Sequence, residues 1–531
     1  MKKGKRFYLK NLLFPAVIFG SITGIFTALA VTFYKMCAKY VIRYSEMGYH
    51  YIREHLYIAP IVLAAFFGIA CLFSLIYKKL PNLRGGGIPT SIGILRGIIS
   101  FQWLKYLVGV FMMSLTAFLI GVPLGNEGPS VQMGTAIGRG SVYSLAKKQR
   151  AWDRYTMTGG ACAGFSVATG APISGIMFAI EEAHQRISPM IIIVSSVSVM
   201  FAYVTTEILD IFFNVGGTLF PRFEPIKLSV ADIWIPLLIG LCIGLFAVLF
   251  LKYYKLIHTF FKNTLKKLSQ TVKIFLMFTV TFLLGLCSYS FISTGHELII
   301  ELFEGGPAIL MLVVILLVRS TLTLGANTSG ITGGTFVPVL ALGAVIAAIL
   351  GKGIIGVFGY GGEYYTAILV LGITACISGM MKMPITAILF AVEALSCYEN
   401  IIYVVVVSAV SFAITEIFGV QSINDSVLEA RVEEVNEGKS VKVIDTFVTV
   451  QKNAFAIRKQ VRDIFWPANL FVLSVQHTSK DAEVDVHGGK AIREGDVLHV
   501  RYSTYDEAQT RAELMAIVGE QDYHEKEADV I

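Results

Sequence analysis

The sequence predicts a polytopic α-helical membrane protein that ends in a small soluble α/β domain. This prediction depends on composition, on long apolar runs and on a change of charge near residue 420. Hydrophobic residues make up 55% of the 531 residues and charged residues 15%, whereas soluble domains carry roughly 25% charged residues. So little charge over such a length indicates that most of the chain lies in a bilayer.

Apolar runs near the length of about 20 residues that crosses a bilayer recur between residues 12 and 418. The runs are continuous rather than alternating, which favours helices over a β-barrel. The basic N-terminus, MKKGKRFYLK, favours a retained first helix with a cytoplasmic start in a multi-pass plasma-membrane protein. The clearest runs are Leu12–Tyr34, Tyr57–Tyr77, Trp234–Leu251, Ile274–Phe291 and Tyr364–Met381.

Charge divides the chain into a basic part and an acidic tail. Residues 421–531 carry 13 of the 44 Lys and Arg but 20 of the 37 Asp and Glu. We therefore expect a transmembrane domain over residues 1–425, a linker over 426–438 and a cytoplasmic domain over 439–531. The seven cysteines include no CxxC pair, and we expect no disulfide, metal site or nucleic-acid partner.

An internal repeat relates the two halves of the predicted membrane domain. GAPISGIMFAIEEA at 170–183 and KMPITAILFAVEAL at 382–395 share Pro, Ile, Phe-Ala and Glu in register. Each copy follows a small-residue segment and, further upstream, a glycine-containing helix start with a Pro. Such duplication is typical of transporters and channels. The sequence alone leaves open whether the two halves are inverted.

Three glycine-rich segments have the form of a loop that opens into a helix. Helix N-termini expose unpaired N–H groups and a partial positive charge, and glycine allows a ligand to approach the backbone closely. Together the segments predict one path for anions, bound by dipoles weakly enough to be released. They are RGGGIPTSIG (84–93), GNEGPSVQMG (125–134) and GGTFVPVLALG (333–343).

Glu127 stands alone in the second of these segments. Apart from Arg139 it is the only charged residue between Tyr106 and Ala146. Acidic residues within a membrane are costly and therefore functional by default. A helix-capping role is the structural alternative.

The three segments, in this order, resemble the signature motifs of the CLC family of chloride channels and proton/chloride exchangers, in its prokaryotic form. GGGIP is similar to the family's GSGIP, GNEGP to GxEGP and GTFVP to GxFxP. The resemblance covers most of residues 10–425. It implies a CLC-type two-repeat fold with broken helices, a homodimer, and transport of chloride and other small anions with protons.

The resemblance also implies roles for three acidic residues. Glu127 stands at the position of the gating glutamate, which occupies an anion site when ionised and withdraws when protonated. Glu182 is similar to the internal proton-relay glutamate of the exchangers, with a cytoplasmic helix-end acid as its structural alternative. Glu181 is expected to line the water route to Glu182.

The implied anion site includes two departures from the family pattern. Its residues are Gly86, Gly87, Ile88, Thr335, Phe336 and Asn424, and the ring of Phe336 is expected to wall the pathway. Gly86 replaces the family's anion-coordinating serine, and Asn424 replaces its inner-gate tyrosine. Both changes imply weaker anion binding and a looser gate, which keeps a passive gated chloride channel open as an alternative to exchange.

The sequence of the tail predicts a domain of alternating strands and helices. It has no glycine-rich phosphate loop and no catalytic cluster, so we do not expect the protein to be an enzyme. The predicted strands are 439–448, 469–476, 482–487 and 497–502, and the predicted helices are 453–464 and 506–517.

The tail, including GDVLHV at 495–500, resembles the TrkA-C (RCK-C) regulatory domain of potassium-transport proteins. That resemblance implies pairing of two tails and cyclic di-AMP as a regulatory ligand. The implied ligand contacts are Ile457, Val461, Arg462, Asn469 and Leu470, with a solvated helix face as the alternative for Arg462. A potassium-transport component is a second functional class, which the sequence disfavours because GYGG at 359–362 lacks the lead-in of a potassium filter.

Overall fold

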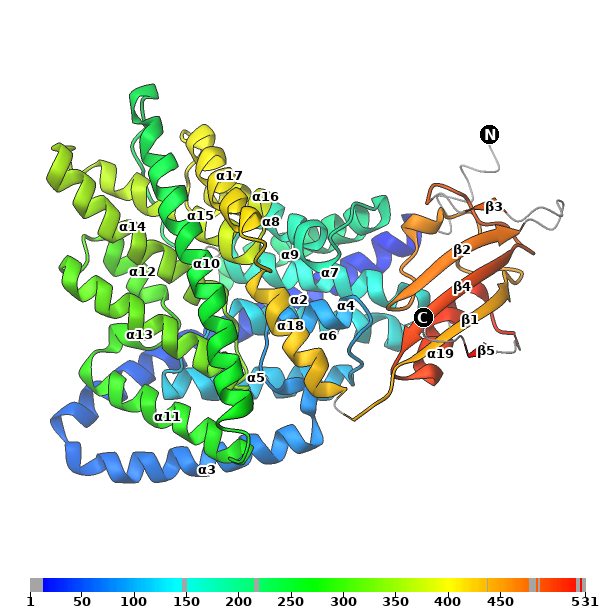
Figure 1. The fold of residues 1–531 in the computed structure, drawn as a ribbon, viewed down its shortest axis with the longest axis horizontal. Coiled ribbons are helices and arrows are strands. Elements are labelled where there is room, and N and C mark those ends of the chain that lie inside the picture. The colour runs from blue at the N-terminus through cyan, green and yellow to red at the C-terminus, as the bar shows by residue number, and fades with distance from the viewer. Residues whose placement is uncertain are drawn as a thin grey trace.

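A computed structural model describes residues 13–145, 150–213, 219–436, 438–476, 484–485, 488–521 and 526–527. The helices form one body, and the tail sheet with its helix α19 (Glu507–Val518) packs at one end of it (Figure 1). The helices of the body are α2 (Phe14–Glu54), α3 (Ala59–Lys79), α4 (Ile88–Leu95), α5 (Trp103–Ile120), α6 (Glu127–Leu145), α7 (Asp153–Thr169), α8 (Pro172–Phe178), α9 (Pro189–Phe213), α10 (Trp234–Asn263), α11 (Gln270–Cys287), α12 (His296–Phe303), α13 (Ile309–Thr328), α14 (Phe336–Phe358), α15 (Tyr364–Met381), α16 (Pro384–Glu393), α17 (Ile401–Ile417) and α18 (Ile423–Val435).

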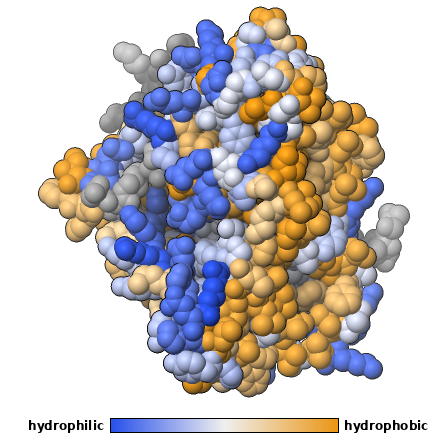
Figure 2. All heavy atoms as spheres, turned by 90° about the vertical axis from the view of Figure 1, so that its left-hand side faces the viewer, coloured by the Kyte–Doolittle hydropathy of each residue, from blue (hydrophilic) through white to orange (hydrophobic). Residues whose placement is uncertain are grey.

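Apolar sequence accounts for the long helices of this body. Within the described residues, nine helices are long and apolar enough to cross a membrane, and the apolar run Tyr364–Met381 coincides with α15. The polytopic helical fold is therefore confirmed. Figure 2 shows the end opposite the tail, where hydrophilic residues gather over the middle and apolar residues cover the right-hand margin.

Small residues let the central helices α6 and α7 pack backbone against backbone. A Cβ atom added at Gly134 would lie 2.0 Å from the carbonyl oxygen of Gly160, and one at Gly160 would lie 2.0 Å from that of Gly134. Without a hydrophobic driving force inside lipid, membrane helices associate through such close contacts. The glycines of the second motif therefore serve helix packing as well as the helix start.

The two copies of the repeat form the short helices α8 and α16, which cap each other. Each carboxylate accepts bonds from the first turn of the helix in the other copy. Glu181 accepts from Ile385 N (2.8 Å), Thr386 N (2.7 Å) and Thr386 Oγ1 (2.7 Å). Glu393 accepts from Ile173 N (2.7 Å), Ser174 N (2.8 Å) and Ser174 Oγ (2.7 Å). The sequence repeat is therefore also a structural repeat. In each copy, a carboxylate caps the N-terminus of the short helix in the other copy.

The tail is a five-stranded sheet of order β3-β2-β4-β1-β5 in which neighbouring strands run antiparallel. Alternating apolar residues of β1 and β4, such as Val448 and Val500, form its core with Leu514 of α19. The predicted strands at 439–448, 469–476 and 497–502 and the predicted helix at 506–517 are confirmed. The prediction over 482–487 falls partly outside the described residues. The strands are β1 (Lys442–Thr449), β2 (Leu470–Gln476), β3 (Val484–Asp485), β4 (Val497–Thr504) and β5 (Lys526–Glu527).

The predicted helix over 453–464 is wrong. Apart from a short 3₁₀ turn at Val461–Asp463, this segment consists of turns, with one bridge from Gln460 to Ala491. Arg458 N donates to Ile492 O (2.7 Å) and Val461 N to Lys490 O (3.1 Å), while Asn453 and Arg458 have positive φ angles. Pairing with a distant segment overrides the local helical pattern.

The boundary between the two domains is a helix rather than an extended linker. Helix α18 begins at Ile423, where Ser422 caps it by accepting a bond from Asp425 N (2.9 Å), and it covers most of the interval 426–438 that was assigned as a linker. The helix ends at Val435, and β1 begins at Lys442.

We expect the reciprocal caps to stabilise the membrane domain about equally. Glu181→Ala and Glu393→Ala each remove the acceptor of three hydrogen bonds, so each variant should lose about 2 kcal/mol and melt several degrees lower in detergent. Glu304→Ala, at an exposed carboxylate, is the control. Melting of either cap variant at the wild-type temperature would contradict the capping role.

Candidate functional site

Three helix starts meet at the centre of the membrane domain. Helices α4, α6 and α14 begin at Ile88, Glu127 and Phe336. The loops before α6 and α14 are joined by two backbone bonds, from Gly125 N to Gly334 O (2.6 Å) and from Gly334 N to Gly125 O (2.9 Å). Their pairing is antiparallel, so the chain runs in opposite directions through the two related motifs.

One glycine from each motif makes this meeting possible. A Cβ at Gly128 would lie 2.6 Å from the Cα of Gly334 and 2.9 Å from the Cα of Gly87. Gly87 also has a positive φ angle of 46°, which a side chain would disfavour. Three N-terminal ends, each with unpaired N–H groups, are thereby held at close quarters.

The side chain of Glu127 lies at this meeting point. It is fully buried, and within the described residues neither carboxylate oxygen has a hydrogen-bond partner. Glu127 Oε2 lies close to Gly125. A Cβ atom added at Gly125 would lie 2.5 Å from this oxygen and 3.4 Å from the backbone nitrogen of Val337. Among helix N-termini such a carboxylate can stay ionised, or take a proton and leave.

Aromatic rings enclose the anion-motif residue Phe336. Its buried ring packs edge-on against Phe165 at 5.1 Å and Phe390 at 5.6 Å between centroids, and Phe165 stacks on Phe178 at 5.5 Å. Phe178 and Phe390 are equivalent residues of the two repeats. The ring of Phe336 thus packs into an apolar aromatic cluster, while its backbone begins α14 directly after the buried Thr335.

A hydroxyl missed by the sequence analysis lies beside Gly86. A Cβ added at Gly86 would lie 2.2 Å from Oγ1 of Thr90, so the Thr90 hydroxyl occupies space that a side chain at residue 86 would take. Thr90 is buried, and within the described residues its hydroxyl has no hydrogen-bond partner. Thr90 is the third residue of α4 and Gly86 lies before that helix with a φ angle of 73°, so helical spacing did not indicate this contact.

Glu182 and Asn424 lie at the second polar cluster of the pathway. Glu182 is in a π-helical turn, Ala179–Ala183, that ends the first repeat, and Asn424 and Asp425 of α18 contribute to its electrostatic surroundings. Both side chains are buried. Oε1 of Glu182 and both polar atoms of the Asn424 amide lack partners among the described residues.

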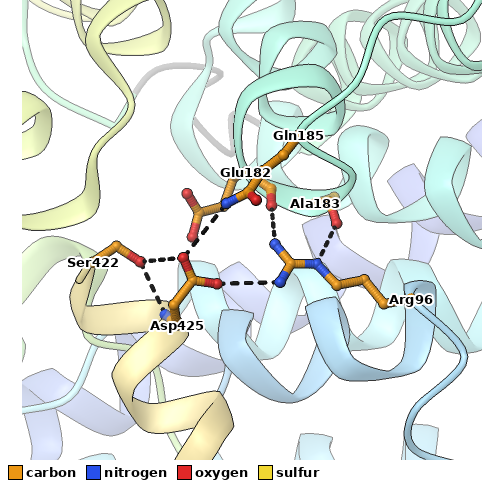
Figure 3. A network of polar contacts seen from close by, with 6 residues as sticks. All are labelled: Arg96, Glu182, Ala183, Gln185, Ser422 and Asp425. Atoms are coloured by element: carbon orange, nitrogen blue, oxygen red, sulfur yellow. Dashed lines mark hydrogen bonds and ion pairs between the residues drawn. The ribbon is translucent and has the colours of Figure 1, made fainter. Parts of the chain in front are cut away.

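Arg96 holds this cluster together, as Figure 3 shows. Its Nε donates to Ala183 O (3.0 Å), one terminal nitrogen donates to Glu182 O (3.0 Å), and the other pairs with Asp425 at 3.2 Å. Asp425 also accepts from Ser422 at 3.1 Å and from Gln185 at 3.5 Å. Arg96 therefore binds the backbone carbonyl of Glu182 rather than its carboxyl group.

The predicted ligand residues of the tail differ in exposure. Val461 and Leu470 are buried in the tail core, and Ile457 packs against that core. Arg462 is exposed and its Nε donates to Gln460 (2.8 Å), while Asn469 is exposed with a φ angle of 54°.

The same segment of the tail docks on the membrane domain through Phe465. The ring lies 4.4 Å from the ring of Tyr155 and 4.4 Å from that of His184, with the guanidinium groups of Arg186 and Arg154 at 4.5 and 5.2 Å. Burial, reinforced by the charges of Arg154, Arg186 and Arg96, lowers the pKa of His184 well below its usual value. A neutral imidazole therefore completes the pocket for Phe465.

Backbone contacts strengthen this docking and reach the Glu182 cluster. Tyr155 Oη donates to Asp463 O (2.6 Å), and Arg154 donates to the carbonyl of Trp466. Arg154 Nε also donates to Leu95 O (2.9 Å), and Leu95 directly precedes Arg96. A chain of direct contacts thus runs from the tail to the backbone of Glu182.

Comparison with known proteins places these features among anion transporters. A family model described as "Voltage gated chloride channel" matches residues 68–416. The chain is 26% identical to the H(+)/Cl(-) exchange transporter ClcA of Vibrio parahaemolyticus over 78% of the chain and 89% of that protein. It is 25% identical to ClcA of Klebsiella pneumoniae over 79% of the chain and 88% of that protein.

Solved structures share the fold. A slow cyanobacterial Cl⁻/H⁺ antiporter aligns with a TM-score of 0.71 at 22% identity, over 80% of this chain and 99% of that one. A CLC-type fluoride/proton antiporter aligns with a TM-score of 0.62 at 17% identity, over 77% and 98%.

Proposed function

The chain belongs to the voltage gated chloride channel family, and on that premise we propose that it carries chloride across the membrane in exchange for protons. The observation that carries this proposal is the buried, unpartnered carboxylate of Glu127 where three helix N-termini meet. Helix N-termini attract anions, so chloride and the ionised carboxylate compete for one place. A proton taken up by Glu127 releases that place to chloride, which links the two movements.

The repeat supports a functional role for Glu182 as the inner proton acceptor. Glu181 and its counterpart Glu393 both serve as helix caps, whereas the counterpart of Glu182 in the second copy is the buried Ala394. The repeat fold therefore does not need a carboxylate at this position. Glu181 is bound to the first turn of α16, so it serves the packing of the two copies beside its proposed place on the water route to Glu182.

Two observations favour exchange over a passive channel. The relatives reported above are named as exchange transporters, and the Thr90 hydroxyl lies where Gly86 lacks one. We propose that Thr90 supplies an anion-binding hydroxyl beside the amides of Gly86, Gly87 and Ile88. If Thr90 supplies this donor, the glycine at residue 86 no longer implies weak anion binding.

A potassium-transport role finds no support in the described structure. GYGG lies in the turn between α14 and α15, away from the meeting point of the three helix starts. Chloride and similar small anions remain the proposed substrates.

The basic end of α10 pairs with α18 through Lys262 and Glu433 at 2.9 Å. The positive-inside rule therefore favours a cytoplasmic position for the tail of this plasma-membrane protein.

We further propose that the tail is a TrkA-C-like domain through which cyclic di-AMP regulates transport in a homodimer. The segment that carries Ile457, Val461, Arg462, Asn469 and Leu470 also carries the docking residue Phe465. A ligand that shifts this segment would act on Arg154 and, through Leu95 and Arg96, on the backbone of Glu182. Helix α18, which bears Asn424, is a second connection between the tail and the Glu182 cluster.

Glu127→Gln should abolish proton movement in reconstituted vesicles while chloride movement persists, because an amide cannot carry a proton. Glu182→Gln should also abolish proton movement, whereas Glu304→Gln should leave both fluxes at wild-type rates. Simultaneous recording of chloride and proton flux gives the answer. Proton-coupled uptake at the wild-type rate in Glu127→Gln would refute the proposal. If chloride flux through the wild-type protein does not change with the pH gradient, the passive channel is favoured.

Thr90→Val should weaken chloride binding roughly tenfold, because one hydrogen bond to an anion contributes about 1.5 kcal/mol. Thr90→Ser, which keeps the hydroxyl, should bind chloride nearly as wild type does. Calorimetric chloride titration measures both variants. Equal affinity of the Val and wild-type proteins would show that the anion is not bound by this hydroxyl.

Cyclic di-AMP should bind the full-length protein with one nucleotide per two chains and should reduce chloride flux. Arg462→Ala should weaken this binding about tenfold, whereas Lys452→Ala, at an exposed lysine of the same segment, should not. Phe465→Ala should still bind but respond less in flux, because the docking contact is lost. Calorimetry without detectable binding at high micromolar nucleotide would remove the ligand assignment and leave the transport proposal standing.

A further inference from the structure

A basic cavity lies between the end of α3, the start of α11 and the end of α18. Its volume is about 300 Å³, within the range of small-molecule sites. The charged side chains around it are Lys78, Arg84, Arg431 and Glu434. None of these residues belongs to the anion and proton pathway described above.

The charges around this cavity do not balance. One carboxylate, Glu434, contacts the guanidinium groups of both Arg84 and Arg431. Lys78 is exposed at the rim and adds a third positive charge. Three cations against one anion leave an excess of two positive charges.

The side chains of the two arginines are mostly buried beside the cavity. The side chain of Arg431 is only 7% exposed, and one of its terminal nitrogens donates to the carbonyl of Pro81. Among the described residues, however, the buried Nε atoms of Arg431 and Arg84 have no partner. Both guanidinium groups contact the single carboxylate of Glu434 and so lie close to each other. Like charges at short distance repel, and an anion in the cavity would offset that repulsion.

We propose that this cavity binds a phosphate-bearing anion, and that an anionic phospholipid headgroup is its natural source. Guanidinium groups match phosphate oxygens in charge and geometry, and basic pockets between membrane helices on the cytoplasmic side suit lipid headgroups. Beside the rim, α3 and α11 pack together and expose Leu72, Leu75 and Leu276. These apolar side chains provide a surface for acyl chains.

The cavity is connected to the elements that form the pathway. Arg84 directly precedes Gly85, whose N–H donates to Gly330 O (2.9 Å). Tyr77 at the cavity wall bonds Thr332 at 3.0 Å, in the loop before α14. Arg431 lies two turns after Asn424 on α18. An occupant would therefore brace the loops before α4 and α14 from the tail side.

The test uses full-length protein in detergent and follows its melting temperature as phospholipid is added. Phosphatidylglycerol should raise the melting temperature, and phosphatidylcholine should do so less. Lys78→Gln and Arg84→Gln should each need about ten times more phosphatidylglycerol for the same rise, because each removes one charge-assisted contact. Lys79→Gln, at the neighbouring exposed lysine outside the cavity, should respond as wild type does.

Glycerol 3-phosphate distinguishes the two sources of phosphate. If it alone reproduces the full rise and Lys78→Gln weakens its effect, the site stands and its ligand is soluble. The proposal is overturned if neither compound stabilises the wild-type protein more than phosphatidylcholine does. It is equally overturned if Lys78→Gln and Lys79→Gln respond alike. Lys78 is exposed, so its variant keeps the test valid even where Arg84→Gln fails to fold.

Discussion

The burial of the Glu127 carboxylate at the start of α6 constrains the whole membrane domain. A charge placed there costs several kcal/mol unless fixed dipoles compensate it, and the carboxylate lies beside the backbone amides at the starts of α6 and α14. Compensation must come from the N-termini of α4, α6 and α14, which is why three glycines touch at Gly87, Gly128 and Gly334. The glycine motifs therefore allow the three helix N-termini to come close enough to stabilise the Glu127 carboxylate.

Duplication explains how two distant halves of the chain reach this geometry. Gly125 and Gly334 exchange backbone bonds, and Glu181 and Glu393 exchange helix caps. The halves then diverge where function needs asymmetry. Glu127 has Phe336 as its counterpart, and Glu182 has Ala394. Each copy thus contributes the same scaffold, while the first copy alone carries the acidic residues Glu127 and Glu182.

The inner side of the domain is organised around backbone carbonyls rather than side chains. Arg96 holds the carbonyls of Glu182 and Ala183, and Arg154 holds those of Leu95 and Trp466. Because both arginines bind main-chain atoms, movement of the tail would be transmitted to the backbone that positions Glu182. Phe465, enclosed by aromatic rings and guanidinium groups, anchors the tail end of this connection.

The sequence by itself determined the membrane fold, the repeat, the three helix starts, the isolated Glu127 and most tail strands. These features follow from local patterns: apolar length, glycine before a helix, and alternation along a strand. Only the tertiary structure bound Glu181 to α16, put the Thr90 hydroxyl beside Gly86 and replaced the predicted helix over 453–464 with turns. Each of these depends on a partner brought close by packing, such as Ile385 for Glu181 or Ile492 for Arg458. A pattern within one segment carries no information about which distant backbone group will satisfy it.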